Sequence, residues 1–308
     1  HKITDVDALG AAIGIYRAAK TLNKKAYIVI DNPTSSIIPL MNTFRDDQDY
    51  EADMFVNNHE AKEIMDDNTL LVVVDTNKPS ITQCEDLLYM AKMIVVLDHH
   101  RQGSDTIRNS VLSYIEPYAS SASEMVAEIL QYFTEGIRIR NVEADSIYAG
   151  IMIDTDNFMQ KTGVRTFEAA AFLRRCGADV TRVRKLFRED MNDYKARGET
   201  IRNAELFRGQ FAISECPSDY VDSPTVVGAQ AANELLNIVG VKASFVLTEY
   251  KGVIYISARA IDEVNVQIIM ERMGGGGHLN MAGCQLETVD LEGARSLLKS
   301  TLTALQDG

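Results

Sequence analysis

The chain has 308 residues, of which 46% are hydrophobic, and this length suits two domains better than one. Its formal net charge of -13 is too acidic for a protein that tracks long nucleic-acid backbones, so a small ligand is favoured over duplex nucleic acid. Four scattered cysteines predict neither a zinc cluster nor a disulfide framework, as is typical of a reduced cytoplasmic protein, and no stretch reaches the roughly 20 apolar residues that span a bilayer.

The first part of the chain alternates predicted helices and strands. Helices are expected over 8–22, 80–90, 122–134 and 141–152, and strands over 25–31, 70–75, 93–97 and 111–115. Strands 70–75 and 93–97 are almost entirely apolar, as in parallel strands buried on both faces. Ser121-x-x-Glu124 predicts a capping box at the start of the third helix. The alternation predicts a doubly wound, mainly parallel α/β domain.

The second part has a different pattern. Residues 179–205 are charge-dense without a broad apolar face, as expected for a helical linker between domains. Strands are then expected over 205–214, 243–249 and 252–258, with helices over 225–238, 264–272 and 290–305. We therefore expect an α/β chain with a domain over 1–178, a linker over 179–205 and a smaller mixed α/β domain over 206–308.

Five acidic residues of the first part end apolar stretches or open a predicted loop: Asp5, Asp7, Asp75, Asp98 and Asp154. Asp75 and Asp98 close two separate parallel strands, and the carboxyl ends of such strands meet at the ligand-binding edge of a sheet. Taken alone, each acid is an ordinary turn former or helix N-cap. Gathered in one crevice, the five would repel one another unless cations neutralised them.

Three of the five histidines fall on the same predicted loops, namely His1, His99 and His100. Carboxylate and imidazole ligands from several segments predict a pair of divalent metals. Two close metals indicate phosphoryl chemistry.

The motifs His1-x3-Asp5-x-Asp7, Asp75, Asp98-His99-His100 and Asp154 together resemble those of the DHH phosphoesterase superfamily, and the run Gly274 to His278 resembles its DHH-associated second domain. Segments 115–125, 161–167, 256–259, 265–267 and 273–279 are most similar to the GdpP-type cyclic-di-AMP phosphodiesterases. The resemblance covers nearly the whole chain. Family members carry an apolar strand and a glycine ahead of the first histidine, so we expect this sequence to be part of a longer protein.

The resemblance implies one ion held by His1, Asp5 and Asp75, and a second held by Asp7, Asp75, His99 and Asp154, with Asp75 bridging. This mixed ligand set suits two Mn²⁺ ions, with Mg²⁺ or Co²⁺ as substitutes. Asp98 and His100 are the expected catalytic pair. Asp98 would orient a histidine ring, and His100 would lie near the metals or contact the phosphate.

Substrate contacts are expected from a further set of residues: Arg101, Arg165, Ser257, Arg259, Gly274, Gly275, Gly276, Gly277 and His278. The alternative for the glycines is a helix C-cap, but a cap needs only one, and four in a row favour close approach of a ligand to the backbone. The alternative for Arg259 is a surface salt bridge with Asp262 or Glu263.

The implied function is hydrolysis of cyclic-di-AMP to the linear 5′-phosphorylated dinucleotide pApA, with cyclic-di-GMP as a further substrate, in a cleft between the two domains. One alternative is a nanoRNase or pAp phosphatase acting on short linear oligonucleotides. Another is a nucleotide-sensing module without turnover. The resemblance also implies a homodimer and, upstream, membrane and sensory domains, with this part in the cytoplasm.

Overall fold

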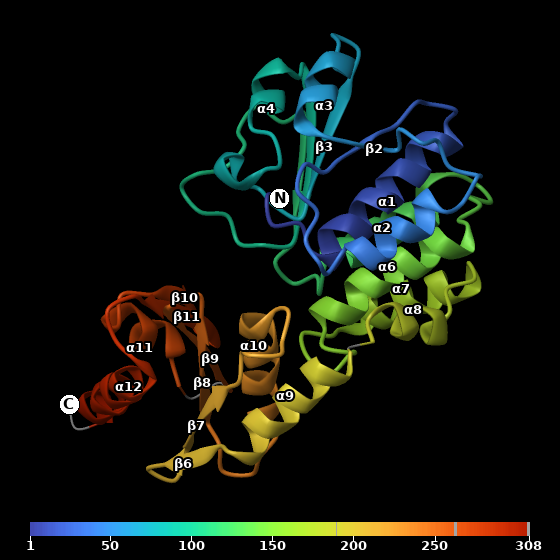
Figure 1. Ribbon diagram of the computed structural model, residues 1–308. Coiled ribbons are helices and arrows are strands. Elements are labelled where there is room, and N and C mark those ends of the chain that lie inside the picture. Colours follow the sequence, from blue (N-terminus) through green and yellow to red (C-terminus); the bar gives the residue numbers. More distant parts are fainter. Residues whose placement is uncertain (189, 262–263, 307–308) are drawn as a thin grey trace. The chain divides into compact units, whose positions relative to one another are not determined.

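The computed structural model describes residues 1–188, 190–261 and 264–306 (Figure 1). The chain divides into two compact units, residues 1–188 and 189–308. Among the described residues, no helix has the length and apolar character needed to cross a membrane. All four cysteines are free thiols.

The first unit combines short parallel strands with many helices. Its elements are α1 (Val6–Thr21), β1 (Ile28–Val29), α2 (Ile38–Arg45), β2 (Phe55–Val56), α3 (Asn58–Ile64), β3 (Leu70–Val74), the 3-10 turn η1 (Pro79–Ile81), α4 (Asp86–Met90), β4 (Met93–Asp98), β5 (Leu112–Ile115), α5 (Ala122–Phe133), α6 (Asn141–Asp154), α7 (Val164–Arg175) and α8 (Val180–Leu186). Strands β3, β4 and β5 form one parallel sheet in that order, and β1 and β2 form a separate parallel pair. Since β3 and β4 are parallel and in register, the residues that follow them lie at one edge of the sheet.

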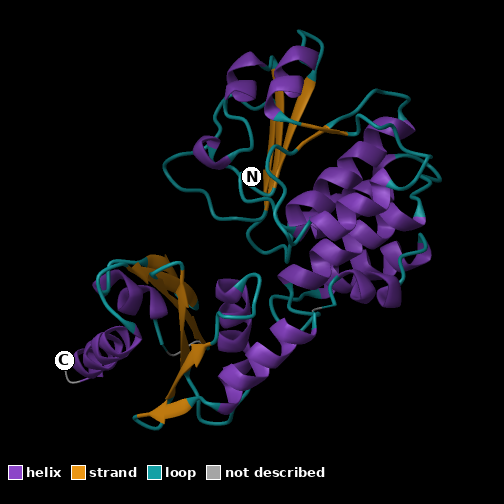
Figure 2. Ribbon diagram, viewed as in Figure 1, coloured by secondary structure: helices purple, strands orange, loops and turns teal. Residues whose placement is uncertain are grey.

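Helices cover both faces of this three-stranded sheet. On one face, Val73 and Ile94 share a core with Leu88 of α4. On the other face, Leu97 belongs to the main core of the unit, which includes Leu9 of α1 and is built mostly from helices. Figure 2 shows how strongly helices dominate this unit. The parallel sheet between helices confirms the α/β fold expected for the first domain.

Helix α5 starts at the predicted residue, but its capping box is only half formed. The Ser121 hydroxyl accepts the N–H of Glu124 at 3.0 Å, as a capping box requires. The Glu124 carboxylate accepts the N–H and hydroxyl of Ser120 instead of returning to Ser121. As in any helix, the first N–H groups of α5 have no carbonyl partner within the helix and can bond a side chain from elsewhere in the unit.

Two predicted elements of the first unit are shorter than expected. The strand over 25–31 is reduced to Ile28–Val29, because its ladder with β2 extends over only two residue pairs. The helix over 80–90 is replaced by η1 and α4, because Thr82 between them has an extended backbone with ψ of 153°.

The second unit is a mixed sheet between two helical layers. Its elements are α9 (Met191–Arg202), β6 (Glu205–Phe207), β7 (Phe211–Cys216), α10 (Pro224–Leu235), β8 (Ala243–Tyr250), β9 (Val253–Ala260), α11 (Val266–Arg272), β10 (Gly276–His278), β11 (Met281–Leu286) and α12 (Leu291–Gln306). The strand order is β10-β11-β9-β8-β7-β6, in which β7 and β8 are parallel and the other pairs antiparallel. One face packs against α11 and α12 and the other against α9 and α10 (Figure 2).

The strand predicted over 205–214 is a hairpin. Arg208 and Gly209 adopt left-handed conformations, with φ of 50° and 72°, and reverse the chain between β6 and β7. In the sequence, Gly209 is a recognisable turn residue, but nothing about Arg208 indicates that it adopts a left-handed conformation.

The charge-dense segment 179–205 forms two helices that belong to different units. Val183 of α8 is fully buried in the main core of the first unit. Ala196 of α9 is fully buried against α10 in the second unit. A few apolar side chains thus anchor each helix, and the division between the units falls at 188/189.

The main core of the first unit makes a direct stability prediction. Replacing the fully buried Leu130 of α5 by alanine should lower the free energy of unfolding by about 2–5 kcal/mol, because it removes packed methyl groups and leaves a cavity. Tyr132 on the same helix is 83% exposed, and Tyr132→Ala should cost only about 0.5 kcal/mol or less. Urea unfolding followed by circular dichroism measures both. Equal losses in the two variants would contradict this assignment of the core.

Candidate metal centre

Asp75 lies at the point where β3 ends, and only 2% of its surface is exposed. Its φ of 59° is left-handed, a conformation that Asp and Asn tolerate better than other non-glycine residues. The carboxylate therefore stands at the carboxyl edge of the parallel sheet, where ligands bind in such folds. A buried acid on an unusual backbone is typical of functional sites.

The two oxygens of Asp75 face different partners. Oδ2 lies 3.1 Å from Nε2 of His1, which is itself 3.6 Å from Oδ2 of Asp5. Oδ1 lies 3.3 Å from Nε2 of His99. One carboxylate therefore lies between two groups of potential ligands.

Asp5 and Asp7 are fixed by the starts of two helices. Asp5 is the N-cap of α1, and its Oδ1 accepts the N–H of Ala8 at 2.9 Å while its Oδ2 faces the imidazole of His1. Asp7 is 1% exposed, and its two oxygens accept the N–H groups of Ala122 and Ser123 at 2.7 and 2.8 Å. These are the first N–H groups of α5, whose positive end stabilises the buried carboxylate.

His99 joins the second group of ligands. Its Nε2 lies 3.5 Å from Oδ2 of Asp154 and 3.8 Å from Oδ2 of Asp7. Asp154 is the last residue of α6. The loop after β4, the end of α6 and the start of α1 thus bring their side chains to one place.

Burial shifts the titration of these acids. It raises the pKa of Asp7 well above its ordinary value, and the negative charges of Asp75 and Asp154 add to the effect. Burial likewise raises the pKa of Asp154 to about 6, although His99 opposes this. Burial also disfavours the charge on Asp75, but its contacts with His1 and His99 outweigh this and lower its pKa to about 2. Asp75 is therefore the acid that most firmly keeps its charge.

The two half-buried histidines, His1 and His99, respond in the opposite way. Burial lowers the pKa of His1, but the contacts with Asp5 and Asp75 outweigh it and raise the value to about 10. Burial also opposes the charge on His99, and the carboxylates of Asp75 and Asp7 raise its pKa to about 9. Positive charge is thus stabilised at the two positions where cations would bind.

The donor set fits divalent metal ions. The residues form three groups, and within each group the potential ligand atoms lie within 4.8 Å of one another. The groups are His1, Asp5 and Asp75; Asp7, His99 and Asp154; and Asp75, His99 and His100. Oδ1 of Asp75 is buried and faces Nε2 of His99 at 3.3 Å, but it makes no well-aligned hydrogen bond with the described residues. Such an oxygen is costly to bury unless a positive charge lies beside it, and a cation would supply one. The first two groups correspond to the ligands expected for the two ions, with Asp75 adjoining both.

Asp98 contacts His100 and lies in the interior of the unit, outside the three groups of potential ligands. It is fully buried, and its Oδ1 lies 2.8 Å from Nδ1 of His100 and accepts the N–H of the same residue at 3.1 Å. The side chain of His100 is 57% exposed, and its Nδ1 is 3.7 Å from Oδ1 of Asp75. The imidazole therefore stands at the solvent side of the centre.

The structure brings Arg165 to a carboxylate of its own unit. Its Nε and Nη2 donate to Glu128 at 2.7 and 2.6 Å, and Nη2 donates to the hydroxyl of Tyr114 at 3.1 Å. Hydrogen bonding to Glu128 raises the pKa of this guanidinium above its ordinary value. A fork already filled by a carboxylate is less available to a phosphate. Arg101, by contrast, is exposed directly after the second histidine of the motif.

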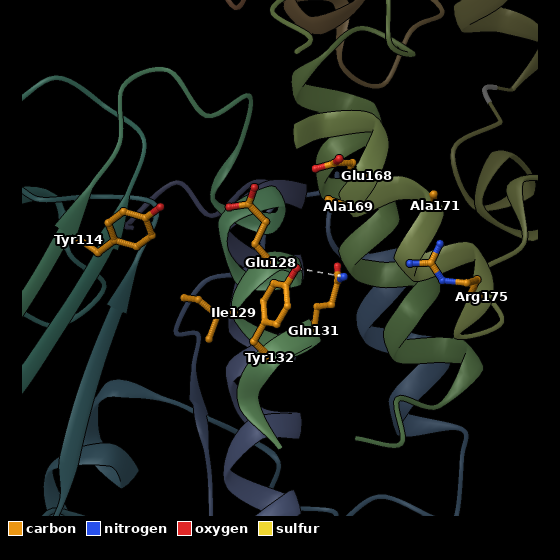
Figure 3. Close-up of a pocket in the computed structure, with 9 residues that line it drawn as sticks. All are labelled: Tyr114, Glu128, Ile129, Gln131, Tyr132, Glu168, Ala169, Ala171 and Arg175. Atoms are coloured by element: carbon orange, nitrogen blue, oxygen red, sulfur yellow. Dashed lines mark hydrogen bonds between the residues drawn. The ribbon is translucent and has the colours of Figure 1, made fainter. Parts of the chain in front are cut away.

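A hollow of about 640 Å³ lies beside this ion pair, between α5, α7 and β5 (Figure 3). It is lined by Tyr114, Glu128, Ile129, Gln131, Tyr132, Glu168, Ala169, Ala171 and Arg175. No histidine or aspartate of the candidate centre lines it, so it is a separate feature of the first unit.

The glycine run of the second unit forms the start of a β-hairpin. Gly274, with φ of 84°, ends α11, and the N–H of Gly275 bonds to the carbonyl of Met270, as in a helix C-cap. Side chains on Gly275 and Gly277 would lie 2.1 and 2.5 Å from the backbone of β11. Backbone conformation and packing thus account for three of the four glycines. Gly276 has open space around it.

Ser257 and Arg259 lie on β9, on the face opposite to the buried Ile256 and Ala258. The Nη1 of Arg259 donates to the carbonyl of Ala258 at 2.9 Å, and its buried Nε has no hydrogen-bond partner among the described residues. Burial lowers the pKa of this guanidinium. Its alternative partners, Asp262 and Glu263, lie outside the described residues. His278 is exposed at the end of β10.

Sequence reasoning missed two supports of the centre. Asn77, two residues after Asp75, donates its side-chain amide to Asp98. The start of α5 holds Asp7, although the sequence there indicated only a helix cap. The position of Asn77 just after a strand-end acid could have indicated its role. The contact of Asp7 with the start of α5 joins residues more than 100 positions apart, and no local pattern indicates it.

Models of two protein families match the chain. The DHH family, N-terminal domain, matches residues 1–151, and the DHHA1 domain matches residues 211–304. The chain therefore carries a DHH-family N-terminal domain followed by a DHHA1 domain, as the motifs indicated.

Two characterised relatives are similar over the whole of this chain. It is 41% identical to the cyclic-di-AMP phosphodiesterase GdpP of Bacillus subtilis and 38% identical to the cyclic-di-AMP phosphodiesterase PdeA of Listeria monocytogenes. All of this chain is covered in both comparisons, together with 47% of each relative. The chain thus spans about half the length of these relatives.

A solved structure supports the fold independently. An exopolyphosphatase-related protein from Bacteroides fragilis superposes with a TM-score of 0.81, covering 98% of this chain and 89% of that chain, at 20% identity. At that identity the likeness concerns the fold alone, and it agrees with the expected α/β class.

Gly150 of α6 allows a test of the support around Asp7. A Cβ at this position would lie 2.1 Å from Oγ and 2.8 Å from Cβ of Ser123, and 3.0 Å from Oδ1 of Asp7. Gly150→Ala should push the start of α5 away from Asp7 and weaken Mn²⁺ binding by about 10- to 100-fold, as loss of ligand support commonly does. Gly198→Ala is the matched control, because open space surrounds this helical glycine. Calorimetric Mn²⁺ titration of the folded variants measures the effect, and unchanged affinity in Gly150→Ala would refute it.

The raised pKa values of His1 and His99 predict a pH dependence of metal binding. Both rings are positively charged at pH 7 in the metal-free chain, with a proton on each nitrogen, since their pKa values are about 10 and 9. Metal ligation requires the neutral rings, so Mn²⁺ binding should release protons, and affinity should rise from pH 7 to 8.5 by up to about tenfold per proton per pH unit. Calorimetry in buffers of different ionisation enthalpy measures the protons released. Affinity that stays constant over this range would contradict the assignment.

Proposed function

We propose that this chain is the catalytic part of a metal-dependent phosphodiesterase that hydrolyses cyclic-di-AMP to pApA. The observation that carries the proposal is the position of Asp75, whose two oxygens face two separate groups of histidine and aspartate ligands. Two adjacent metal sites suit phosphodiester hydrolysis. The identity to two relatives named as cyclic-di-AMP phosphodiesterases supports the choice of substrate.

In this proposal, some residues of the first unit bind the metal ions and others position the histidine that contacts the substrate. His1, Asp5 and Asp75 would hold one Mn²⁺, and Asp7, Asp75, His99 and Asp154 a second. Two bound ions supply Lewis-acid charge and lower the pKa of a bound water. Asp98 accepts a hydrogen bond from Nδ1–H of His100, which directs Nε2 of that ring outward. In its neutral form this nitrogen would accept a proton from the attacking water, and in its protonated form it would donate one to a phosphate oxygen or to the leaving oxygen.

The second unit would bind the nucleotide. Arg259 suits this role because its Nε is buried without a hydrogen-bond partner among the described residues. Gly276 and His278 suit it because both lie on an edge strand with open space at the glycine. Ser257 lies on the same face of β9 as Arg259. Arg101 is a further candidate, whereas Arg165 would first have to leave Glu128.

We also propose, from the resemblance, that the chain acts as a homodimer. The relatives are about twice as long as this chain, and this length supports additional domains in the complete protein. A membrane anchor and sensory modules upstream, with this part in the cytoplasm, are the domains that the resemblance implies.

Asp75→Asn tests the proposed bridging role. Asparagine tolerates the left-handed backbone and has the same shape, so the variant should fold, but it lacks the charge that faces both ligand groups. Mn²⁺-dependent hydrolysis of cyclic-di-AMP should fall by on the order of 1000-fold or more. Circular dichroism checks the fold. Turnover within tenfold of the wild-type chain would rule out the role of Asp75.

The substrate is tested by comparing turnover of cyclic-di-AMP, cyclic-di-GMP and the linear dinucleotide pApA. Faster turnover of the linear dinucleotide would assign the chain to the nanoRNase class, and nucleotide binding without any turnover would assign it to the sensors. His278→Ala serves as the companion variant, because it should weaken nucleotide binding while Mn²⁺ affinity stays the same. Equal loss of both affinities would contradict a substrate role for His278.

A further inference from the structure

Asn77 links the loop after β3 to the end of β4. Only 2% of its surface is exposed, and its Nδ2 lies 2.5 Å from Oδ2 of Asp98 and 3.3 Å from the carbonyl oxygen of His100. The side chain therefore contacts both the buried acid and the backbone of the exposed histidine.

The amide of Asn77 satisfies one oxygen of a buried charge. Asp98 is fully buried, and its Oδ1 receives both the N–H of His100 and Nδ1 of the same ring. Asn77 donates to the other oxygen, Oδ2. A buried carboxylate without such a donor would be strongly destabilised, and it would turn towards other partners.

The orientation of His100 depends on this carboxylate. Its ring is 57% exposed, so surrounding side chains leave it room to rotate, and the contact of Nδ1 with Asp98 at 2.8 Å opposes rotation. A carboxylate at Nδ1 stabilises the tautomer with a proton on Nδ1 and leaves Nε2 as the nitrogen for a substrate. Asn77, Asp98 and His100 thus form a line of contacts from the interior to the solvent side of the centre.

We propose that Asn77 is a positioning residue for the phosphodiesterase reaction: it fixes the carboxylate of Asp98 so that His100 presents Nε2 to the reacting phosphate. The inference rests on the proposed function for its catalytic consequence, but the positioning itself is a property of the metal-free chain. Asn77 acts through Asp98 and His100, the two residues that its Nδ2 contacts.

The side chain and backbone of Asn77 have separable roles. Its carbonyl oxygen accepts the N–H of Ile107 at 2.9 Å, which ties two loops together. This acceptor belongs to the main chain and is present in every variant, whereas the contacts with Asp98 and His100 depend on the side-chain amide. A change in the amide therefore probes the positioning and spares the connection between the loops.

Asn77→Leu is the variant that tests this proposal, because leucine has a similar shape and no donor. In the Mn²⁺-loaded 308-residue chain, kcat for cyclic-di-AMP should fall by about 10- to 100-fold, with KM and Mn²⁺ affinity each within about threefold of the wild-type values. Asn109→Leu is the matched control. Asn109 also donates its amide from a loop of the first unit, but to the carbonyl of Leu88, and its loss should leave kcat unchanged.

A spectroscopic measurement separates positioning from a general structural effect. In the metal-free wild-type chain, the ¹⁵N resonances of the His100 ring should show a single tautomer with the proton on Nδ1, and in Asn77→Leu they should show a mixture. If Asn77→Leu does not fold, Asn77→Ala, which fits any space that asparagine fills, is measured in the same way. Unchanged His100 resonances in the folded variant, or a loss of Mn²⁺ affinity equal to the loss of kcat, would overturn the proposal.

The same experiments distinguish this inference from the proposed function. A wild-type chain that binds Mn²⁺ but does not hydrolyse cyclic dinucleotides would refute the function, while the His100 resonances would still report whether Asn77 fixes the ring. A wild-type chain that hydrolyses cyclic-di-AMP, with Asn77→Leu equally active, would refute the role of Asn77 alone.

Discussion

Negative charge removed from water is the constraint on which the first unit depends. Asp7, Asp75 and Asp98 are all at least 98% buried, within a chain that is already strongly acidic. Buried carboxylates persist only when N–H groups, cations or protons surround them. The three are satisfied in three ways: Asp7 by the start of a helix, Asp98 by an amide and an imidazole, and Asp75 by two histidines that stand where ions would bind.

This constraint connects the fold to the chemistry. Parallel strands bring the ends of β3 and β4 to one edge, and the packing of α1 against α5 and α6 brings Asp7 and Asp154 to the same edge. Gly150 permits the close approach of α6 to Ser123 at the start of α5. The core therefore determines the ligand geometry, and changes in packing well away from the solvent side should alter metal affinity.

The sequence was sufficient for the parts of the structure that depend on local pattern. Apolar runs ending in acids predicted β3 and β4, and the acids and histidines of the motifs do converge. Features set by tertiary contact were not predictable. Helix α7 was missed, the left-handed Arg208 split one strand into a hairpin, and the contacts of Asn77 and of the start of α5 join residues distant in sequence. Arg165 was predicted to bind phosphate because no local pattern indicates that Glu128, 37 positions away, lies beside it.

The glycine run from Gly274 to Gly277 has a consequence for how evolution can act on the second unit. One of its members is required by the end of α11, and two are required because they pack directly against the backbone of β11. These requirements hold whatever molecule the unit recognises. Selection for a correctly folded hairpin would preserve them even in descendants that had changed or lost their ligand. Retention of this motif in a distant homologue would therefore indicate shared architecture, and divergence of specificity should be sought at Gly276 and in the side chains around it.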